Sequence, residues 1–236
     1  MSDYENEEES DIYLNYHGAQ LTWDDYGVLQ NPDEWLMDQV WRARIHDSYL
    51  IHEELAKHPS SRVIFVPPAI SVMINEHFSP TEIPYINEAS HIFLPINDGS
   101  GAHQDGGSHW SLLVISTHDR RAFHYDSSGS MLAHHARRLC RVISGWFGYD
   151  ITFRDLPETP QQTDGSACGV FICWAMKHLL VRRLLAVESD HVVDMSLGAK
   201  NVNLKEVRME MRELVFNLRR NACRSIQTEK RPPTRS

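Results

Sequence analysis

The stretch Pro160–Trp174, P-Q-Q-T-D-G-S-A-C-G-V-F-I-C-W, places a cysteine at the beginning of a predicted helix. The Asp, Gly and Ser residues at 164–166 are types that favour turns and helix N-caps. The apolar run Val170–Leu180 is long enough for a buried helix. The positive end of the helix dipole would favour the thiolate of Cys168, which is the nucleophilic form of a cysteine. Taken alone, the same pattern also fits a small buried hydrophobic cysteine.

A histidine and an aspartate are predicted to share one end of a β-hairpin. The run 106–116, G-G-S-H-W-S-L-L-V-I-S, continues after His109 as an apolar strand, and 122–126, A-F-H-Y-D, is a second short strand that ends at Asp126. The short polar segment between them is typical of a hairpin loop. Antiparallel pairing would place Asp126 roughly opposite residues 109–111. Such a carboxylate orients an imidazole, so the chain offers the Cys, His and Asp that a cysteine protease requires.

Four separate motifs resemble the Ulp/sentrin-specific proteases, a family of cysteine proteases that act on ubiquitin-like proteins. The motifs are E-W-L-M-D-Q-V at 34–40, L-P-I-N-D at 94–98, H-W-S-L-L-V with F-H-Y-D at 109–126, and P-x-Q-(x5)-C-G at 160–169. The similarity covers roughly residues 20–180. The I-N-D sequence, followed by a loop that ends G-G-x-H-W-S-L-L, looks most like the deneddylase branch, which removes the Nedd-type modifier from cullins.

The resemblance implies a role for each residue of the predicted centre. Cys168 would be the nucleophile, His109 the general base and Asp126 the residue that orients it. Gln162 would donate its amide to the oxyanion, together with the backbone N–H of Cys168. No metal or organic cofactor is implied, because the reaction proceeds through acyl transfer to the cysteine.

The resemblance also implies a narrow substrate tunnel. Trp35 and Trp110 would roof this tunnel over the diglycine tail of the modifier, since only glycine presents no side chain to a closed aromatic slot. Asp38 would pair with a basic residue of the tail. Gly106 and Gly107, in the loop that leads to the base, would contact the substrate.

The chain departs from the family pattern at two positions beside the nucleophile. Ala167 stands where the family usually has Asp, and Asp164 stands where it commonly has Asn. Neither residue performs a chemical step in the implied mechanism. The departures therefore bear on the hydrogen bonds that seat the loop, and through them on the rate.

Composition limits the class of protein and its partners. The chain of 236 residues is 42% hydrophobic and 23% charged, which is typical of a soluble globular protein. Its four cysteines have no metal-type spacing, which argues against zinc and a disulfide framework and for a reducing compartment. No apolar run has the length of a membrane span, and no basic and apolar signal region is present. Without the six acids of 1–11 the net charge of −9 becomes −3, so a basic nucleic-acid surface is not expected.

The predicted fold class is α+β: a papain-like cysteine protease of the Ulp/sentrin-specific type, with a small mixed or antiparallel sheet flanked by helices. The domain is predicted to span residues 20–218, between a disordered acidic tail at 1–19 and a disordered basic tail at 219–236. The other predicted elements are helices over 33–57, 69–77, 132–147 and 203–218, and strands over 62–66, 91–96 and 151–153.

The main functional prediction is a monomeric thiol isopeptidase, cytoplasmic or nuclear, that cleaves after the C-terminal Gly-Gly of a ubiquitin-like modifier. Its partners would be that modifier, Nedd-type before SUMO, and conjugates such as cullins, with no nucleic acid and no membrane. Three alternatives stay open: a SUMO-specific protease, an acetyltransferase built on the same Cys-His-Asp arrangement, and a catalytically silent modifier-binding module.

Overall fold

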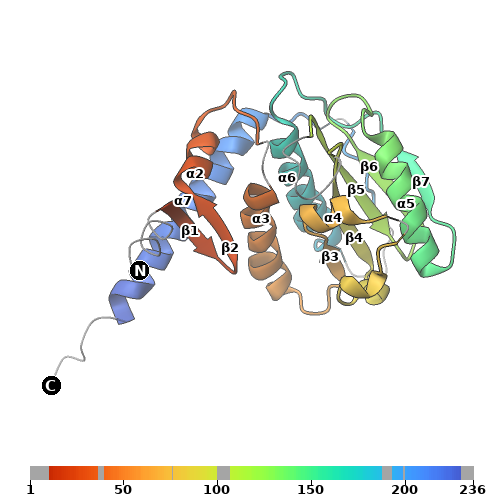
Figure 1. Cartoon of the computed structure of the whole chain (residues 1–236), viewed down its shortest axis with the longest axis horizontal. Helices are drawn as coiled ribbons and strands as arrows, with labels where there is room; N and C mark the ends of the chain where they lie inside the picture. Colours follow the sequence, from red (N-terminus) through yellow and green to blue (C-terminus); the bar gives the residue numbers. More distant parts are fainter. Residues whose placement is uncertain are drawn as a thin grey trace, which may run out of the picture.

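The computed structural model describes residues 11–36, 40–75, 77–99, 107–187, 193–198 and 200–229. Its centre is a five-stranded mixed sheet in the order β3-β4-β5-β6-β7 (Figure 1). The outer pairs β3–β4 and β6–β7 are parallel, and the inner pairs are antiparallel. The predicted α+β class with a small mixed sheet is confirmed. The strands are β3 Val63–Phe65, β4 His91–Asn97, β5 Trp110–Ser116, β6 Arg121–Tyr125 and β7 Thr152–Asp155.

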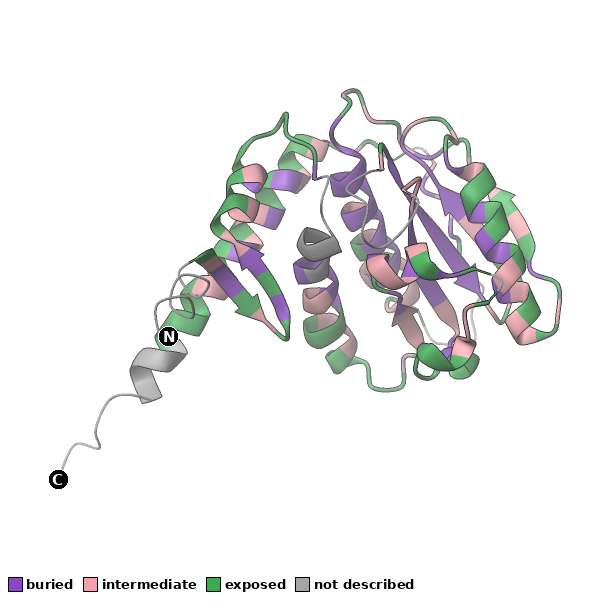
Figure 2. Cartoon of the chain, viewed as in Figure 1, coloured by how far each residue is buried: buried purple, intermediate pink, exposed green. Residues whose placement is uncertain are grey.

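Strand β5 lies in the middle of the sheet and is covered on both faces. All of its residues are buried. Leu112 and Val114 point into one hydrophobic core, whereas Leu113 and Ile115 point into the other. A strand with two covered faces reads as a continuous apolar run, which is why the sequence here does not alternate. Figure 2 shows this buried sheet between helices whose outer sides are exposed.

Helices cover the two faces of the sheet in separate groups. Helix α6 belongs to one core together with residues of α3 and α7, and nine of its twelve residues are buried. Helix α5 lies on the opposite face, in a second core that also includes Ile74, which follows α4. A helix that is apolar on all sides, such as α6, is stable only when it is enclosed. The helices are α2 Trp23–Gln30, α3 Val40–Tyr49, α4 Pro68–Met73, α5 Ala133–Phe147, α6 Cys168–Leu179 and α7 Leu204–Glu229.

The ordered domain is longer at both ends than the sequence predicts. Residues 12–19, assigned to a disordered tail, belong mostly to a hairpin of β1 (Ile12–Tyr16) and β2 (Ala19–Thr22), and α7 continues past residue 218 to Glu229. The two ends stabilise each other, because the guanidinium of Arg219 lies 4.3 Å from the ring centroid of Tyr13. Charge composition along a local stretch does not reveal such a long-range cation–π contact.

Several other element boundaries differ from the predicted ones. The helix predicted over 33–57 is α3 followed by a π-helical turn, Leu50–Glu54, and a 3₁₀ turn, Leu55–Lys57. The predicted helix over 69–77 ends early, at Met73. The hairpin of β5 and β6, strands β3 and β4 and helix α5 are confirmed. Across the described ranges, no helix combines the length and apolar character needed to cross a membrane.

A buried arginine connects α7 to the segment that precedes α3. Arg208 is 4% exposed. Its Nη1 donates to the carbonyl oxygens of Val28 and Asn31 at 3.0 and 3.1 Å, and its Nη2 donates to that of Glu34 at 2.7 Å. These bonds satisfy carbonyl groups at the end of α2 and in the loop that follows it. Arg208 therefore fixes the chain just before Trp35.

Replacing Arg208 by Met should destabilise the protein while keeping the apolar part of the side chain. Three carbonyl groups would lose a charged donor, so we expect the free energy of unfolding to fall by about 2–4 kcal/mol. Urea denaturation of the purified variant measures this change. Arg220→Met, an exposed position on the same helix, is the matched control and should stay within about 0.5 kcal/mol of the wild type. Equal effects of the two substitutions would contradict the anchoring role of Arg208.

Candidate active site

His109 and Asp126 meet at one end of the β5–β6 hairpin. His109 precedes β5 and Asp126 follows β6, and the Nε2 atom of His109 lies 2.6 Å from Oδ1 of Asp126. Leu112 pairs with Tyr125 across the hairpin, so the same register carried on by one residue places Asp126 opposite Ser111. The predicted placement of the two residues is confirmed. Both are buried, with exposed fractions of 4% and 3%.

Cys168 lies close to this pair, on a different element of the fold. It is the first residue of α6 and is 4% exposed. Its thiol lies close enough to the side chain of His109 to raise the pKa of that imidazole. Because Nε2 of the imidazole is bonded to Asp126, the ring nitrogen that remains for the thiol is Nδ1. The structure thus brings together the three residues that the sequence analysis placed in one centre.

The charges of the site favour a protonated His109. Burial alone would lower the pKa of His109, but the hydrogen bonds to Asp126 and Cys168 and the negative charges of these groups raise it to about 9. Burial likewise acts to raise the pKa of Asp126, yet hydrogen bonds from His109 and from the backbone N–H groups of Leu132 and Ser128 hold it below its usual value.

The other cysteines lie in different surroundings. Cys140 and Cys173 are buried, and Cys223 is exposed on α7. Burial raises the pKa of Cys140 and raises that of Cys173 well above its usual value. Neither buried thiol is therefore prepared to act as a nucleophile. Within the part of the chain that the structure describes, no three His, Cys, Asp or Glu residues are grouped as a metal site.

Asn97 and Asp98 hold the backbone of His109, a role that the sequence analysis did not assign. The Nδ2 atom of Asn97 donates to the carbonyl oxygen of His109 at 3.0 Å. Oδ1 of Asp98 accepts from the backbone N–H groups of Ser108 and His109 at 2.6 and 3.1 Å. Through these contacts, the I-N-D sequence clamps the backbone at His109. The position of this sequence just before the loop that leads to the histidine was the signal from which this role could have been predicted.

Gly107 has a structural reason to be glycine. A Cβ atom added at this position would collide with the side-chain amide of Asn97. The glycine lets this amide reach the carbonyl group of His109. Gly106, which the sequence analysis grouped with Gly107, lies outside the described residues.

Gln162 is held with its amide in a defined orientation. Its Oε1 atom accepts from the hydroxyl of Ser127 at 2.7 Å, and its Nε2 atom donates to the carbonyl oxygen of Asp164 at 2.6 Å. The backbone N–H of Gln162 also donates to the carbonyl oxygen of Ser127. An amide nitrogen carries two hydrogens, so one donor of Gln162 remains beyond the bond to Asp164.

Asp164 organises the loop that leads to the cysteine. Its Oδ1 atom accepts from the backbone N–H groups of Ser166 and Ala167 at 2.9 Å each, and from the hydroxyl of Ser166 at 3.2 Å. An Asn side chain has the same acceptor in the same place, so Asp164 preserves the hydrogen bonds available to the more common residue. Ala167 takes part through its backbone N–H.

Of the residues predicted to form the tunnel and bind the tail, Trp35 and Trp110 lie within the described part of the chain. Trp35 is 38% exposed, whereas Trp110 is 9% exposed and belongs to the same core as Leu36 and Cys168. Leu36 lies directly over the first turn of α6, because a Cβ atom added to Gly169 would be 3.0 Å from the Cβ of Leu36. The sequence analysis did not single out this close contact. Asp38 lies outside the described residues.

A second buried histidine, on strand β6, lies close in sequence to Asp126. His124, two residues before Asp126, is fully buried; its Nδ1 atom is 2.7 Å from Oδ1 of Asp155, and its Nε2 atom is 2.9 Å from Oγ of Ser111. Both ring nitrogens are therefore satisfied within the sheet. These contacts connect β5, β6 and β7, and they explain why a polar side chain is tolerated in the interior.

Replacing Asp126 by Asn should lower the pKa of His109 from about 9 towards its usual value of 6.5 or below. The carboxylate charge disappears while burial, which acts in the opposite direction, remains. Because the folded-state pKa of His109 is raised, its contribution to stability is complete below pH 6.5 and is lost as the pH rises through 9. The variant should lack this pH-dependent contribution.

Nuclear magnetic resonance (NMR) titration of the imidazole measures the pKa, and urea denaturation across the same pH range measures the stability. Asp150→Asn removes an exposed carboxylate and should leave both measurements unchanged. An unchanged pKa of His109 in Asp126→Asn would show that the carboxylate does not hold the proton on the ring.

Asp164→Ala should disturb the loop that precedes Cys168, whereas Asp164→Asn should preserve it. The alanine variant leaves the N–H groups of Ser166 and Ala167 without their acceptor, which costs about 1–3 kcal/mol. We expect its alkylation rate at Cys168 to change by about tenfold or more, with the asparagine variant close to wild type. Iodoacetamide labelling in a Cys223→Ser background, read by mass spectrometry, measures the rate. Equal rates in all three proteins would rule out a seating role for Asp164.

The comparisons with known proteins agree with this geometry. Residues 34–214 match the family model described as the Ulp1 protease family, C-terminal catalytic domain. The chain is 27% identical over 215 residues to NEDD8-specific protease 2 of Schizosaccharomyces pombe, covering 88% of this chain and 51% of that protein. It is 29% identical over 175 residues to NEDD8-specific protease 1 of Arabidopsis thaliana, covering 71% of this chain and 74% of that protein.

A solved structure shares the fold. The Ulp1-like SUMO protease catalytic domain of Chaetomium thermophilum superposes with a TM-score of 0.58 at 17% identity, covering 93% of this chain and 89% of that domain. The chain spans about half the length of the S. pombe relative. The family match extends over most of the chain and includes every residue of the site described above. The chain belongs to the Ulp1 family of cysteine proteases.

Proposed function

We propose that this protein is a deneddylase: a cysteine isopeptidase that hydrolyses the bond after the C-terminal Gly-Gly of a NEDD8-type modifier. The observation that carries the chemical part is the buried pair of His109 and Asp126, 2.6 Å apart, with Cys168 close enough to raise the pKa of the same imidazole. The relatives that are named NEDD8-specific proteases support the choice of modifier.

In the first proposed step, the thiolate of Cys168 attacks the carbonyl carbon of the terminal glycine. The carbonyl π electrons move to the oxygen, and a tetrahedral oxyanion forms. The imidazolium of His109 then donates its proton to the departing lysine amine, and the C–N bond breaks. Asp126 keeps the ring oriented and stabilises its protonated form during this step. The products are the free amine and a thioester between Cys168 and the modifier.

The oxyanion would be stabilised by two donors on neighbouring segments. The first is the backbone N–H of Cys168 at the start of α6, and the second is the remaining N–H of Gln162. The bonds from Gln162 to Ser127 and Asp164 fix its amide before substrate binds. A donor that is oriented in advance needs no reorganisation when charge develops on the substrate.

In the second proposed step, water hydrolyses the thioester. Neutral His109 accepts a proton from the water, and the hydroxide adds to the thioester carbonyl. The C–S bond then breaks, which regenerates the thiolate of Cys168 beside the imidazolium and releases the modifier as a carboxylic acid. This acid passes its proton through solvent water to the freed lysine amine. Atoms and protons balance without a metal or a redox partner.

The diglycine tail would enter between Trp35 and Trp110. The contact of Leu36 with Gly169 brings the Trp35 segment close to the first turn of α6, which supports a narrow approach to the thiol in this proposal. A narrow slot rejects residues that carry a side chain. We assign Asp38 to a basic residue of the tail, and Gly106 and Gly107 to the substrate-facing side of the loop before His109.

A test of the function uses modifiers that carry an electrophile at the C-terminal glycine. NEDD8, SUMO and ubiquitin probes of matched design should label the protein at Cys168, with NEDD8 fastest. A preference of a hundredfold requires a difference of only about 2.8 kcal/mol between transition states. Cys168→Ala should lose labelling and turnover but still fold and bind the modifier. Matched fluorogenic derivatives of the three modifiers then give kcat/KM for the wild type.

Each contrary outcome removes a different part of the proposal. Fastest reaction with SUMO would identify a SUMO protease and leave the chemistry standing. Tight modifier binding without labelling of Cys168 would identify a silent binding module. Labelling of Cys140, Cys173 or Cys223, or full turnover by Cys168→Ala, would remove Cys168 as the nucleophile.

A further inference from the structure

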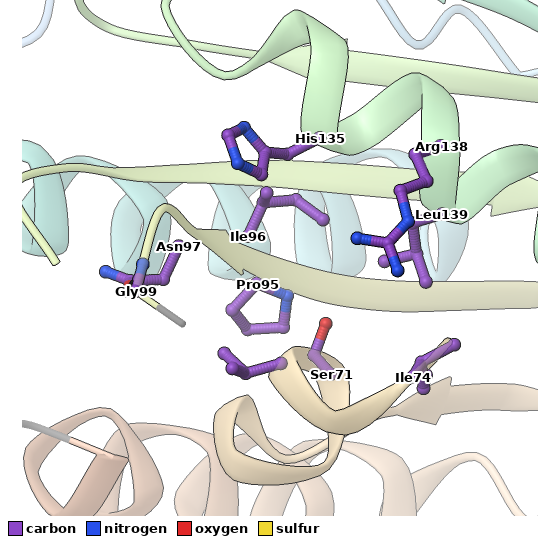
Figure 3. Close-up of a pocket in the computed structure, with 10 residues that line it drawn as sticks. Ser71, Ile74, Pro95, Ile96, Asn97, Gly99, His135, Arg138 and Leu139 are labelled. Carbon is purple, nitrogen blue, oxygen red and sulfur yellow. Dashed lines mark hydrogen bonds between the residues drawn. The ribbon is translucent and has the colours of Figure 1, made fainter. Parts of the chain in front are cut away.

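A cavity lies on the face of the sheet opposite α6, between α4 and α5 (Figure 3). Its volume is about 90 Å³, enough for several water molecules or one small organic molecule. It is separate from the thiol of Cys168 and shares no lining residue with the proposed oxyanion site. The described residues that line it are Ser71, Val72 and Ile74 on the α4 side, Pro95, Ile96, Asn97 and Gly99 on and after β4, and His135, Arg138 and Leu139 on α5.

A buried hydroxyl in this cavity has no partner among the described residues. Ser71 is 5% exposed, and its Oγ atom makes no hydrogen bond there. In Figure 3 this hydroxyl points away from α4 into the space below the guanidinium of Arg138. Buried polar groups are nearly always hydrogen-bonded, so an unused donor in a cavity wall indicates that an acceptor can be bound there.

The lining contains one permanently charged side chain, the guanidinium of Arg138, and one histidine, His135. Arg138 and His135 lie three residues apart on α5 and so share one side of that helix. Among the described residues, no carboxylate forms an ion pair with Arg138, and none of the lining residues is acidic. A guanidinium with a hydroxyl opposite it is suited to a carboxylate, because both groups donate to oxygen.

The rest of the lining is apolar. Ile74, Ile96 and Leu139 belong to the core beneath the cavity, and Pro95 offers only its ring. These groups favour a ligand with a short hydrocarbon part rather than a bare inorganic anion. The size of the cavity limits that part to a few carbon atoms.

We propose that this cavity binds a short-chain carboxylate, with the carboxylate on Arg138, His135 and Ser71 and the hydrocarbon part on Ile96 and Leu139. The site is connected to the active site through one residue. Asn97, which lines the cavity, also donates to the carbonyl oxygen of His109 at 3.0 Å. An occupant would therefore be one hydrogen-bonded side chain away from the backbone of His109.

The test is an NMR titration of the full chain with butyrate, butanol and butylammonium, which share a hydrocarbon part and differ in charge. Butyrate should shift the backbone signals of Ser71, Ile96 and Leu139 and the side-chain amide of Asn97 in a saturable manner. Butanol and butylammonium should bind at least about tenfold more weakly, the effect of one lost charged hydrogen bond. Equal binding of butanol, or no saturable shift with butyrate, would overturn the proposal.

Variants separate this site from general anion binding. Arg138→Gln and Ser71→Ala should each weaken butyrate binding, the former about tenfold or more, whereas Arg141→Gln, an exposed arginine of α5 outside the lining, should not. Ser71→Ala removes an unpartnered hydroxyl, so the variant should fold normally. A weakening by Arg141→Gln as large as that by Arg138→Gln would mean nonspecific attraction and would also overturn the site.

A capped aspartate, N-acetylaspartate methylamide, distinguishes two sources of the same carboxylate. Tighter binding than butyrate, with the same dependence on Arg138, would assign the pocket to an acidic side chain of a partner protein. Weaker binding would assign it to a free carboxylate. In both cases the cavity binds a carboxylate through Arg138. The titration needs no modifier, so its result is independent of the proposed deneddylase activity.

Discussion

The hydrogen bond of 2.6 Å between His109 and Asp126 lies where the central sheet meets helices from both of its faces. The register of β5 against β6 brings the two residues to one sheet edge. The start of α5 supplies the N–H of Leu132 to the second carboxylate oxygen, at 2.9 Å. Helix α6 adds the thiol of Cys168 from the opposite face. Because the bond needs three elements placed within a few tenths of an ångström, the sheet and both helix layers act as its support.

Burial and charge act against each other at this site, and hydrogen bonding decides the outcome. Both groups are almost fully enclosed, which by itself disfavours their charged forms. Each oxygen of Asp126 nevertheless accepts a backbone N–H, and Oδ1 also binds the imidazole. The carboxylate therefore stays ionised, and its charge favours the protonated ring. A site of the same residues without these backbone donors would bury an unstabilised charge.

Local sequence pattern was sufficient for the parts of the site that lie within one element or one hairpin. The apolar run after Cys168 and the short loop before Asp126 predicted the helix start and the strand register. The contacts that remained unpredicted join distant segments: Asn97 with His109, Leu36 with Gly169, and Arg208 with a loop more than 170 residues before it. The predicted inner boundaries of the two tails were wrong for the same reason, since the cation–π contact of Arg219 with Tyr13 spans almost the whole chain.

The two sides of the proposed substrate entrance are held by separate anchors. On one side, Arg208 fixes the chain before Trp35 through three backbone carbonyls. On the other side, Asn97 and Asp98 fix the backbone at His109. These anchors share no residue and belong to different layers, so each is free to change without moving the other. In the proposed function, substitutions in the Trp35 segment would change the surface that binds the modifier. The contacts of Asn97 and Asp98 would meanwhile keep His109 in the position that the reaction requires.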